Sequence, residues 1–135
     1  MELDKFRIKH SKIIEQYQLI EYHLEGIFGL LEEGDFEELT HRVENDAMGE
    51  LIRKVRFLDK ETNCVYLEKE DFSILDNIRD DRNYWSHESY LELMQNFDKI
   101  DRMYQRLTDN LKTVENMNDK LTNAFRKISK DKYKW

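Results

Sequence analysis

The first thirty residues carry apolar side chains at alternating steps of three and four, and this spacing constrains the fold more than any other feature. The positions are Leu3, Phe6, Ile13, Tyr17, Ile20, Leu24, Ile27 and Leu31, with His10 filling one place. Residues three and four apart lie on one face of an α-helix, so the spacing predicts a single long helix that buries one stripe and ends near Gly34. We expect His10 to be a satisfied residue of the core or its boundary rather than a ligand. His23 lies off the stripe and is expected to be solvated.

Similar apolar spacing recurs over most of the remaining chain. Asp35 precedes a short helical segment, Phe36 to about Val43, and is a suitable N-cap for it. Further stripes follow at residues 48–58, from about residue 69 into the polar cluster at 79–87, and at 90–128. The chain has no proline and four glycines, and 38% of its residues are charged, which is typical of a helical bundle with a solvated outside. We therefore predict an all-α protein, an up-and-down bundle of about four to five helices with long first and last helices, forming one domain over residues 1–135.

The last stripe, residues 90–128, would measure roughly 60 Å as one helix of about 40 residues. Asn118 interrupts its apolar positions. Two arrangements are open: the helix turns near residues 116–119 and Asn118 or Asp119 caps a final helix, or the helix stays straight and its end packs against another chain. In the second arrangement Asn118 sets the register of a dimer. For the basic tail, residues 126–135, we favour a frayed, solvated terminus over an arm whose Tyr133 and Trp135 stack on bases.

Charge, cysteine content and hydropathy exclude several classes of protein. The net charge of −7 argues against a broad nucleic-acid-binding surface, although it is compatible with a small basic pocket. The single cysteine, Cys64, excludes an internal disulfide and a cysteine-rich zinc site. No segment approaches the ~20 apolar residues of a membrane span, and the N-terminus lacks the pattern of a signal peptide. We therefore expect a cytoplasmic protein without a membrane partner.

A polar cluster from Arg79 to His87 lies where a bundle would ordinarily bury leucine or isoleucine. Arg79 and Arg82 continue an apolar stripe, so each guanidinium must be ion-paired or face a water-filled cleft. Arg82 and His87 are five residues apart, about 140° around a helix, and cannot converge on one substrate from an unbroken helix. They meet only if the helix breaks between them or if a second copy supplies one of them. Asn83 and Ser86 are suitable N-caps for a new helix that begins near Ser86.

The hexapeptide Arg82-Asn83-Tyr84-Trp85-Ser86-His87, next to a long final helix in a small all-α chain, resembles the Arg-Asn-x3-His motif of the HEPN superfamily. Members of that superfamily are often metal-independent ribonucleases of toxin–antitoxin, phage-defence or RNA-processing systems, and their active site is typically formed where two motifs meet across a dimer. The resemblance implies that His87 is the acid–base group, that Arg82 binds the phosphate and that Asn83 orients the histidine or the motif backbone. It also implies a homodimer, an RNA substrate, a separate antitoxin or regulatory protein, and no cofactor or metal. We expect Arg79, Tyr84 and Ser86 to contribute to substrate binding.

Two other interpretations are open. In the first, Arg79 and Arg82 are ion-paired to neighbouring carboxylates, and the chain is a non-catalytic module that dimerises or binds a protein partner through its last helix. In the second, which we disfavour, a helical metal enzyme uses Glu38 and His41, but no second Glu-x-x-His pair faces them. The feature that distinguishes a nuclease from an interaction module is whether Arg82 and His87 of two chains line one cleft or are each held locally by a carboxylate.

Overall fold

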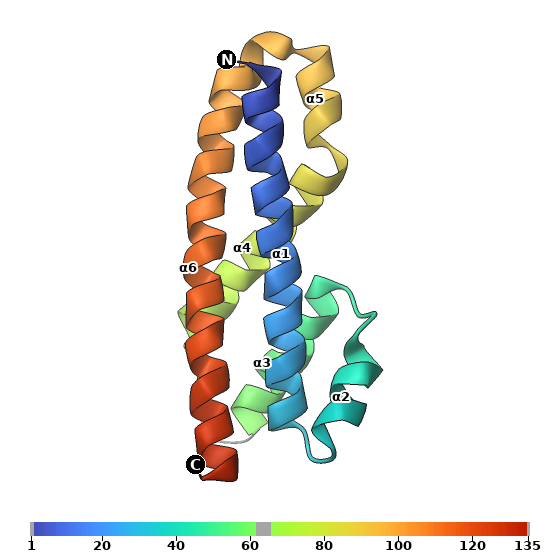
Figure 1. Cartoon of the computed structure of the whole chain (residues 1–135), viewed down its shortest axis with the longest axis vertical. Coiled ribbons are helices and arrows are strands. Elements are labelled where there is room, and N and C mark those ends of the chain that lie inside the picture. The colour runs from blue at the N-terminus through green and yellow to red at the C-terminus, as the bar shows by residue number, and fades with distance from the viewer. Residues whose placement is uncertain (1, 62–65, 135) are drawn as a thin grey trace.

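The computed structural model of the protein describes residues 2–61 and 66–134, and within these ranges it contains six α-helices, one 3-10 helix and no strand. The α-helices are α1 (Leu3–Leu31), α2 (Phe36–Val43), α3 (Met48–Glu61), α4 (Lys69–His87), α5 (Ser89–Gln95) and α6 (Ile100–Tyr133), and the 3-10 helix η1 (Phe97–Lys99) joins the last two. Successive passes of the chain alternate in direction, with α4 and α5 together forming one pass (Figure 1). The predicted all-α bundle with long first and last helices is confirmed.

The two long helices, α1 and α6, lie side by side and run parallel (Figure 1). Hydrogen bonds join them at a nearly constant sequence separation: Lys9 Nζ donates to Thr108 Oγ1 at 3.1 Å, 99 residues away, and Lys132 Nζ donates to the carbonyl oxygen of Leu30 at 3.0 Å, 102 residues away. The parallel arrangement follows from the number of passes, because an odd number of alternating passes leaves the first and the last pointing the same way.

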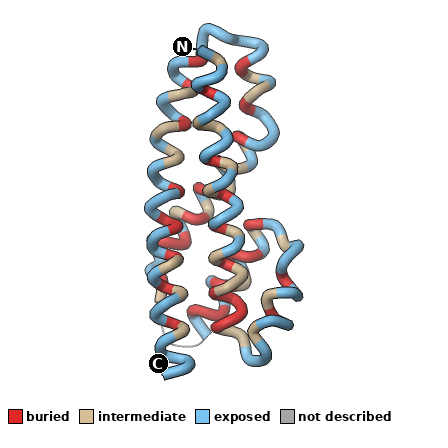
Figure 2. The backbone as a smooth tube through the Cα atoms, in the orientation of Figure 1, coloured by how far each residue is buried: buried red, intermediate tan, exposed pale blue. Residues whose placement is uncertain are grey.

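The apolar stripe of α1 forms the centre of the core, as its spacing predicts. Six of its side chains are at most 1% exposed: Phe6, Ile13, Tyr17, Ile20, Leu24 and Ile27. Buried positions recur along the facing sides of α1 and α6 (Figure 2), and the α6 residues are Met103, Leu107, Val114, Met117, Leu121, Ala124 and Ile128. Full burial of one large apolar side chain contributes about 1.5–3 kcal/mol, so this continuous seam is the main source of stability.

Local signals set several helix ends. Gly34 has a φ of +133°, which an L side chain rarely adopts, and it allows the chain to turn after α1. Asp35 is the N-cap of α2, because its Oδ2 accepts a hydrogen bond from the backbone N–H of Glu38 at 3.2 Å. At the start of α4, Glu68 and Asp71 form a reciprocal capping box. The predicted start and end of α2 are confirmed.

The histidine on the α1 stripe is satisfied at the edge of the core. His10 Nε2 lies 2.7 Å from the carbonyl oxygen of Trp85, and its ring packs against those of Phe6, Trp85 and Tyr90. The expectation that His10 is a satisfied core or boundary residue is therefore confirmed.

For the last long segment, the expected turn near residues 116–119 is wrong. The chain breaks at Asn96, between α5 and η1, and α6 then continues without interruption through residues 116–119 to Tyr133. Asn118 therefore caps no helix. Residues 126–133 complete α6 instead of fraying, and Ile128 among them is 3% exposed.

Asn118 lies on a seam within one chain, between α6 and α1. It is 6% exposed, its Nδ2 donates to the backbone and side-chain oxygens of Gln16 at 3.0 and 2.8 Å, and its Oδ1 accepts from His23 Nδ1 at 2.9 Å. Three intramolecular hydrogen bonds thus satisfy the amide within one chain. The expectation that His23 is solvated is wrong, because its ring is half-buried and bonded to Asn118.

Two residues named from the sequence, Cys64 and Trp135, lie outside the described residues. Among the helices that the structure does describe, none combines the length and the apolar character needed to cross a membrane.

Candidate functional site

Helix α4 continues through the polar cluster, so the residues of the motif are spread around one helix. It runs without a break to His87, a turn follows at Glu88, and α5 begins at Ser89. A helix break between Arg82 and His87, one of the two ways in which they could meet, does not occur, and no new helix begins near Ser86, since the chain turns only after His87. The two basic side chains leave the helix in directions about 140° apart, and a single chain does not bring both to one phosphate.

The guanidinium of Arg82 is turned toward α1, where it pairs with a carboxylate. Arg82 Nη2 lies 3.6 Å from Glu21 Oε1, and the two side chains are 31% and 22% exposed. Burial raises the pKa of Glu21 above its ordinary value, and the positive charge of Arg82 opposes this shift. At 3.6 Å the contact is an ion pair without a hydrogen bond, which leaves the guanidinium N–H groups able to bind another anion.

Asn83 and His87 lie one helical turn apart on a different side of α4, and both are exposed. Within the described residues, His87 makes no hydrogen bond and no ion pair. An exposed imidazole without an internal partner can contact a bound molecule. His87 is therefore the residue of the cluster best placed for chemistry.

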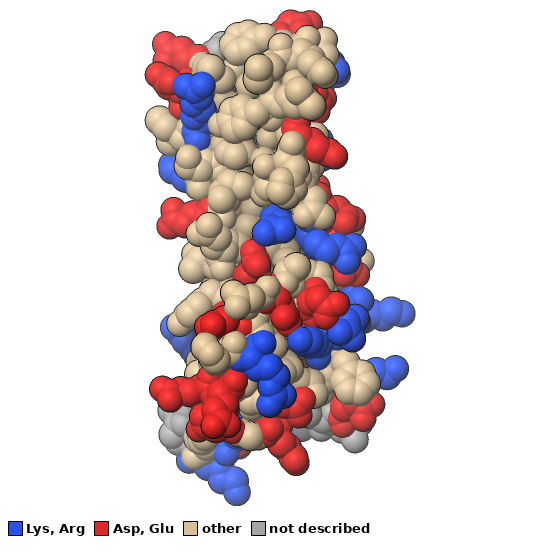
Figure 3. All heavy atoms as spheres, turned by 90° about the vertical axis from the view of Figure 1, so that its right-hand side faces the viewer, with Lys and Arg blue, Asp and Glu red and all other residues tan. Residues whose placement is uncertain are grey.

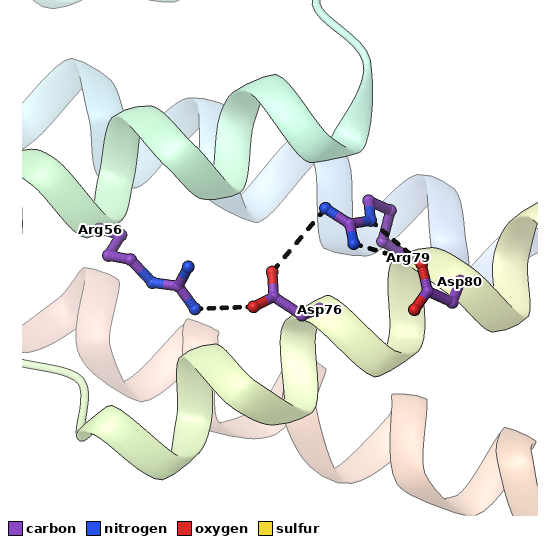
Figure 4. A network of polar contacts seen from close by, with 4 residues as sticks. All are labelled: Arg56, Asp76, Arg79 and Asp80. Carbon is purple, nitrogen blue, oxygen red and sulfur yellow. Dashed lines mark hydrogen bonds and ion pairs between the residues drawn. The ribbon is translucent and has the colours of Figure 1, made fainter.

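Arg79 belongs to a chain of ion pairs that links α3 to α4 (Figure 4). Its Nη2 donates to Asp80 Oδ1 at 3.2 Å, and its Nη1 lies 4.0 Å from Asp76 Oδ1. The other oxygen of Asp76 accepts from Arg56 Nη2 at 2.9 Å. The side chain of Arg79 crosses Gly49 of α3, where an added Cβ would lie 3.1 Å from Arg79 Cδ. Arg79 thus pairs with carboxylates of its own helix and packs against Gly49 of α3, eight residues and about 12 Å along the axis from His87.

Tyr84 is occupied by contacts within the chain. Its hydroxyl donates a hydrogen bond to Glu92 Oε2 of α5, and the guanidinium carbon of Arg106 lies 4.1 Å from its ring centroid. Burial, with the hydrogen bond and charge of Glu92, raises the pKa of Tyr84 to about 12. Of the three predicted substrate contacts, Arg79 and Tyr84 are engaged in internal contacts and Ser86 is exposed.

Three residues that sequence reasoning did not identify hold the cluster in place: Glu21, Glu92 and Arg106. Arg106 Nη2 lies 3.8 Å from Asp81 Oδ1, so the carboxylate of Asp81 in the polar cluster is also ion-paired. Glu21 directly follows the buried Ile20 of α1, and Arg106 directly precedes the buried Leu107 of α6. A charged residue at the edge of an apolar stripe is a signal that would have made them candidate partners.

The surface that follows His87 in the chain is apolar. Leu91 and Met94 of α5 are 60% and 81% exposed, and Phe97 of η1 is 52% exposed. Figure 3 faces the side of the molecule that carries α5, and uncharged atoms dominate its upper part while charged side chains gather lower down. Met94 and Phe97 also line a shallow groove against Leu3 at the start of α1. We call Leu91, Met94 and Phe97 the α5 apolar face.

Metal-ligating side chains do not cluster in the part of the chain that the structure describes, since no group of three or more His, Cys, Asp or Glu is placed to hold an ion. Glu38 and His41 both lie on α2, and His41 Nδ1 is 3.2 Å from Glu44 Oε1.

No protein-family model, no curated protein and no solved structure matches the chain. Its function is therefore inferred from its residues and their geometry.

Proposed function

We propose that the protein is a metal-independent endoribonuclease whose active site is completed by two copies of the chain, with His87 as the acid–base group. The observation that carries the proposal is the state of His87, which ends α4, is exposed and has no partner among the described residues. Asn83 lies one turn away on the same face and can hydrogen-bond to the substrate or to the histidine of the second copy. The resemblance of the Arg82–His87 hexapeptide to the HEPN motif supports the same assignment.

The residue types suit the cleavage of RNA by its own 2′-hydroxyl. A base removes the 2′ proton, the 2′ oxygen attacks phosphorus, an acid protonates the departing 5′ oxygen, and the products are a 2′,3′-cyclic phosphate and a 5′-hydroxyl. Imidazole serves in both roles near neutral pH, and such proton transfer contributes about 10²–10⁴-fold in rate. One His87 cannot be base and acid at the same moment, whereas a symmetric pair supplies both.

Arg82 is assigned to the phosphate. Its forked donors match phosphate oxygens and stabilise the charge of the phosphorane. The 3.6 Å contact with Glu21 holds the side chain near α1 without using its donors in a hydrogen bond. A phosphate that binds there shares Arg82 with a carboxylate whose ionised form burial already disfavours.

A second copy is required because α4 is unbroken between Arg82 and His87. The α5 apolar face supports docking of that copy next to the motif, since exposed apolar patches are typical of interaction sites. A two-fold contact through this face repeats each residue on both sides of the axis and places two copies of His87 near one another.

The test is incubation of mixed RNA with the purified protein in EDTA, using wild type, His87→Ala, Arg82→Ala and His41→Ala. His41 is an exposed histidine on α2, so His41→Ala is the matched control. We expect wild type and His41→Ala to cleave and to leave cyclic-phosphate ends, His87→Ala to be inactive and Arg82→Ala to be nearly so. Cleavage retained by carefully purified His87→Ala overturns the catalytic assignment.

A non-catalytic dimerisation or protein-interaction module is the second candidate. It is favoured by the ion pairs of both arginines in the polar cluster, Arg79 with Asp80 and Arg82 with Glu21. Such a module uses the same α5 apolar face but has no need of a free imidazole. A dimer in sedimentation analysis together with no RNA cleavage by wild type identifies this second function.

A further inference from the structure

A cavity of about 520 Å³ lies between α1, α2 and α6. On the α1 side its lining includes Gly26, where an added Cβ would lie 3.1 Å from the ring of Phe125. Phe36 of α2, whose ring lies against Gly29, packs edge-on to Phe125 of α6, with ring centroids 6.3 Å apart and an interplanar angle of 64°. The cavity thus offers aromatic surface contributed by two helices that are far apart in sequence.

The lining of the cavity is negatively charged. The cavity as a whole is lined by three carboxylates, Glu25, Glu37 and Glu44, and by two histidines, His23 and His41, and no lysine or arginine is among its described lining residues. Glu44 is paired with His41 at 3.2 Å, whereas Glu25 and Glu37 have no ion pair in the part of the chain that the structure describes. Burial raises the pKa of Glu25, and the nearby carboxylates of Glu21, Glu44 and Asp46 raise it further, so Glu25 lies among negative charges.

We propose that this cavity binds a small organic amine, with its ammonium group at Glu25 and Glu37 and its apolar body against Phe36 and Phe125. The volume lies within the range of about 300–1,000 Å³ that holds small molecules. Aromatic rings offer a large apolar contact surface to the body of the ligand, and carboxylates form charge-assisted hydrogen bonds with its ammonium group. The same carboxylates repel anions, which excludes nucleotides and RNA from the cavity. The site shares no residue with the Arg79–His87 cluster and does not depend on the proposed nuclease.

The experiment is an NMR titration of the ¹⁵N-labelled full chain with two matched probe pairs: tryptamine against tryptophol, and hexylamine against hexanol. Each alcohol has the body of its amine but no charge. We expect at least one amine to shift the amide signals of Gly26 and Thr40 saturably at millimolar concentration. We also expect it to bind about tenfold more tightly than its alcohol, the fold-change of one moderate charged interaction.

Two variants distinguish a direct contact of the amine with Glu25 from a general effect of the net charge of the protein. Glu25→Gln keeps the shape of the side chain and is expected to weaken amine binding about tenfold while leaving the alcohol unchanged. Glu15→Gln changes the net charge equally at an exposed position of α1 that does not line the cavity, and we expect it to bind as wild type does. The proposal is overturned when neither amine binds at Gly26 and Thr40, when amine and alcohol bind equally, or when Glu25→Gln behaves like Glu15→Gln.

Discussion

Replacement of Asn118 by Ala removes the amide that joins α6 to α1 in the middle of the bundle. The side chain is 6% exposed and makes three hydrogen bonds, two to Gln16 and one to His23. A hydrogen bond contributes about 0.5–1.5 kcal/mol net, so three contribute about 1.5–4.5 kcal/mol. Gln16 and His23 are half-buried and regain part of this from water, which places the expected loss in unfolding free energy near 2 kcal/mol. For a domain of this size the loss lowers Tm by about 6–10 °C.

Asn110→Ala is the matched control on the same helix. Asn110 is half-buried, and its Nδ2 has no hydrogen-bond partner in the described structure. Removal of an unsatisfied buried donor costs little, so we expect the unfolding free energy to change by less than about 0.5 kcal/mol. Urea denaturation followed by circular dichroism measures both variants. Equal stability of Asn118→Ala and Asn110→Ala, or a loss for Asn118→Ala that varies with protein concentration, refutes the intramolecular hydrogen-bond network.

Burial raises the pKa of Glu25, so the folded protein binds a proton at this carboxylate more readily than the unfolded chain does. The resulting contribution to folding stability is fully present below the ordinary pKa of a glutamate and is lost as pH rises through the raised pKa. We therefore expect Glu25→Gln to unfold at a higher urea concentration than wild type at pH 7, and we expect this difference to vanish at about pH 4. A difference that grows on acidification contradicts the raised pKa of Glu25. Gly29→Ala is expected to lower the free energy of unfolding by about 1–3 kcal/mol, because an added Cβ would lie 2.7 Å from Thr40 Cγ2 of α2, and this clash outweighs the better helix propensity of alanine. A higher stability of Gly29→Ala in urea denaturation shows that α2 does not pack this closely on α1. The double variant Leu91→Glu, Met94→Glu is expected to sediment as a monomer and to lose RNA cleavage while keeping its helical circular dichroism; a dimer that still cleaves RNA places the interface elsewhere.

The parts of the fold that sequence predicts are those set by local chemistry. The α1 stripe repeats over 29 residues, and its burial follows from helical spacing alone. The start of α2 follows from Gly34 and the Asp35 side chain, which act within a few residues of the helix. Such signals do not depend on which distant element packs against the helix.

The sequence did not predict where the last long segment breaks, because the end of α5 and the course of α6 depend on residues that are distant in the chain. Asn118 is a polar interruption in the sequence, but Gln16 and His23, about a hundred residues earlier, satisfy it inside a straight helix. The real break at Asn96 leaves the apolar stripe in phase, because Leu93 before it and Ile100 after it are both buried. A spacing pattern cannot reveal a break across which the buried face continues.

The candidate site shows the same division. Arg82, Asn83 and His87 were found from the motif, and their spacing showed that one unbroken helix cannot converge Arg82 with His87. The pairing of Arg82 with Glu21 required knowledge that α1 passes beside α4, which no local pattern contains. The cavity at Gly26 was missed for the same reason, since its aromatic lining comes from α2 and α6.

RNA cleavage by an equimolar mixture of wild type and His87→Ala, after exchange of subunits, tests the shared active site most directly. If the two copies of His87 act as base and acid in one site, only wild-type homodimers cleave, and random pairing makes these about one quarter of all dimers. The account predicts a rate per total protein of about one quarter of the wild-type rate. A rate of about one half shows that each His87 acts alone, and no cleavage by the wild type itself contradicts the nuclease.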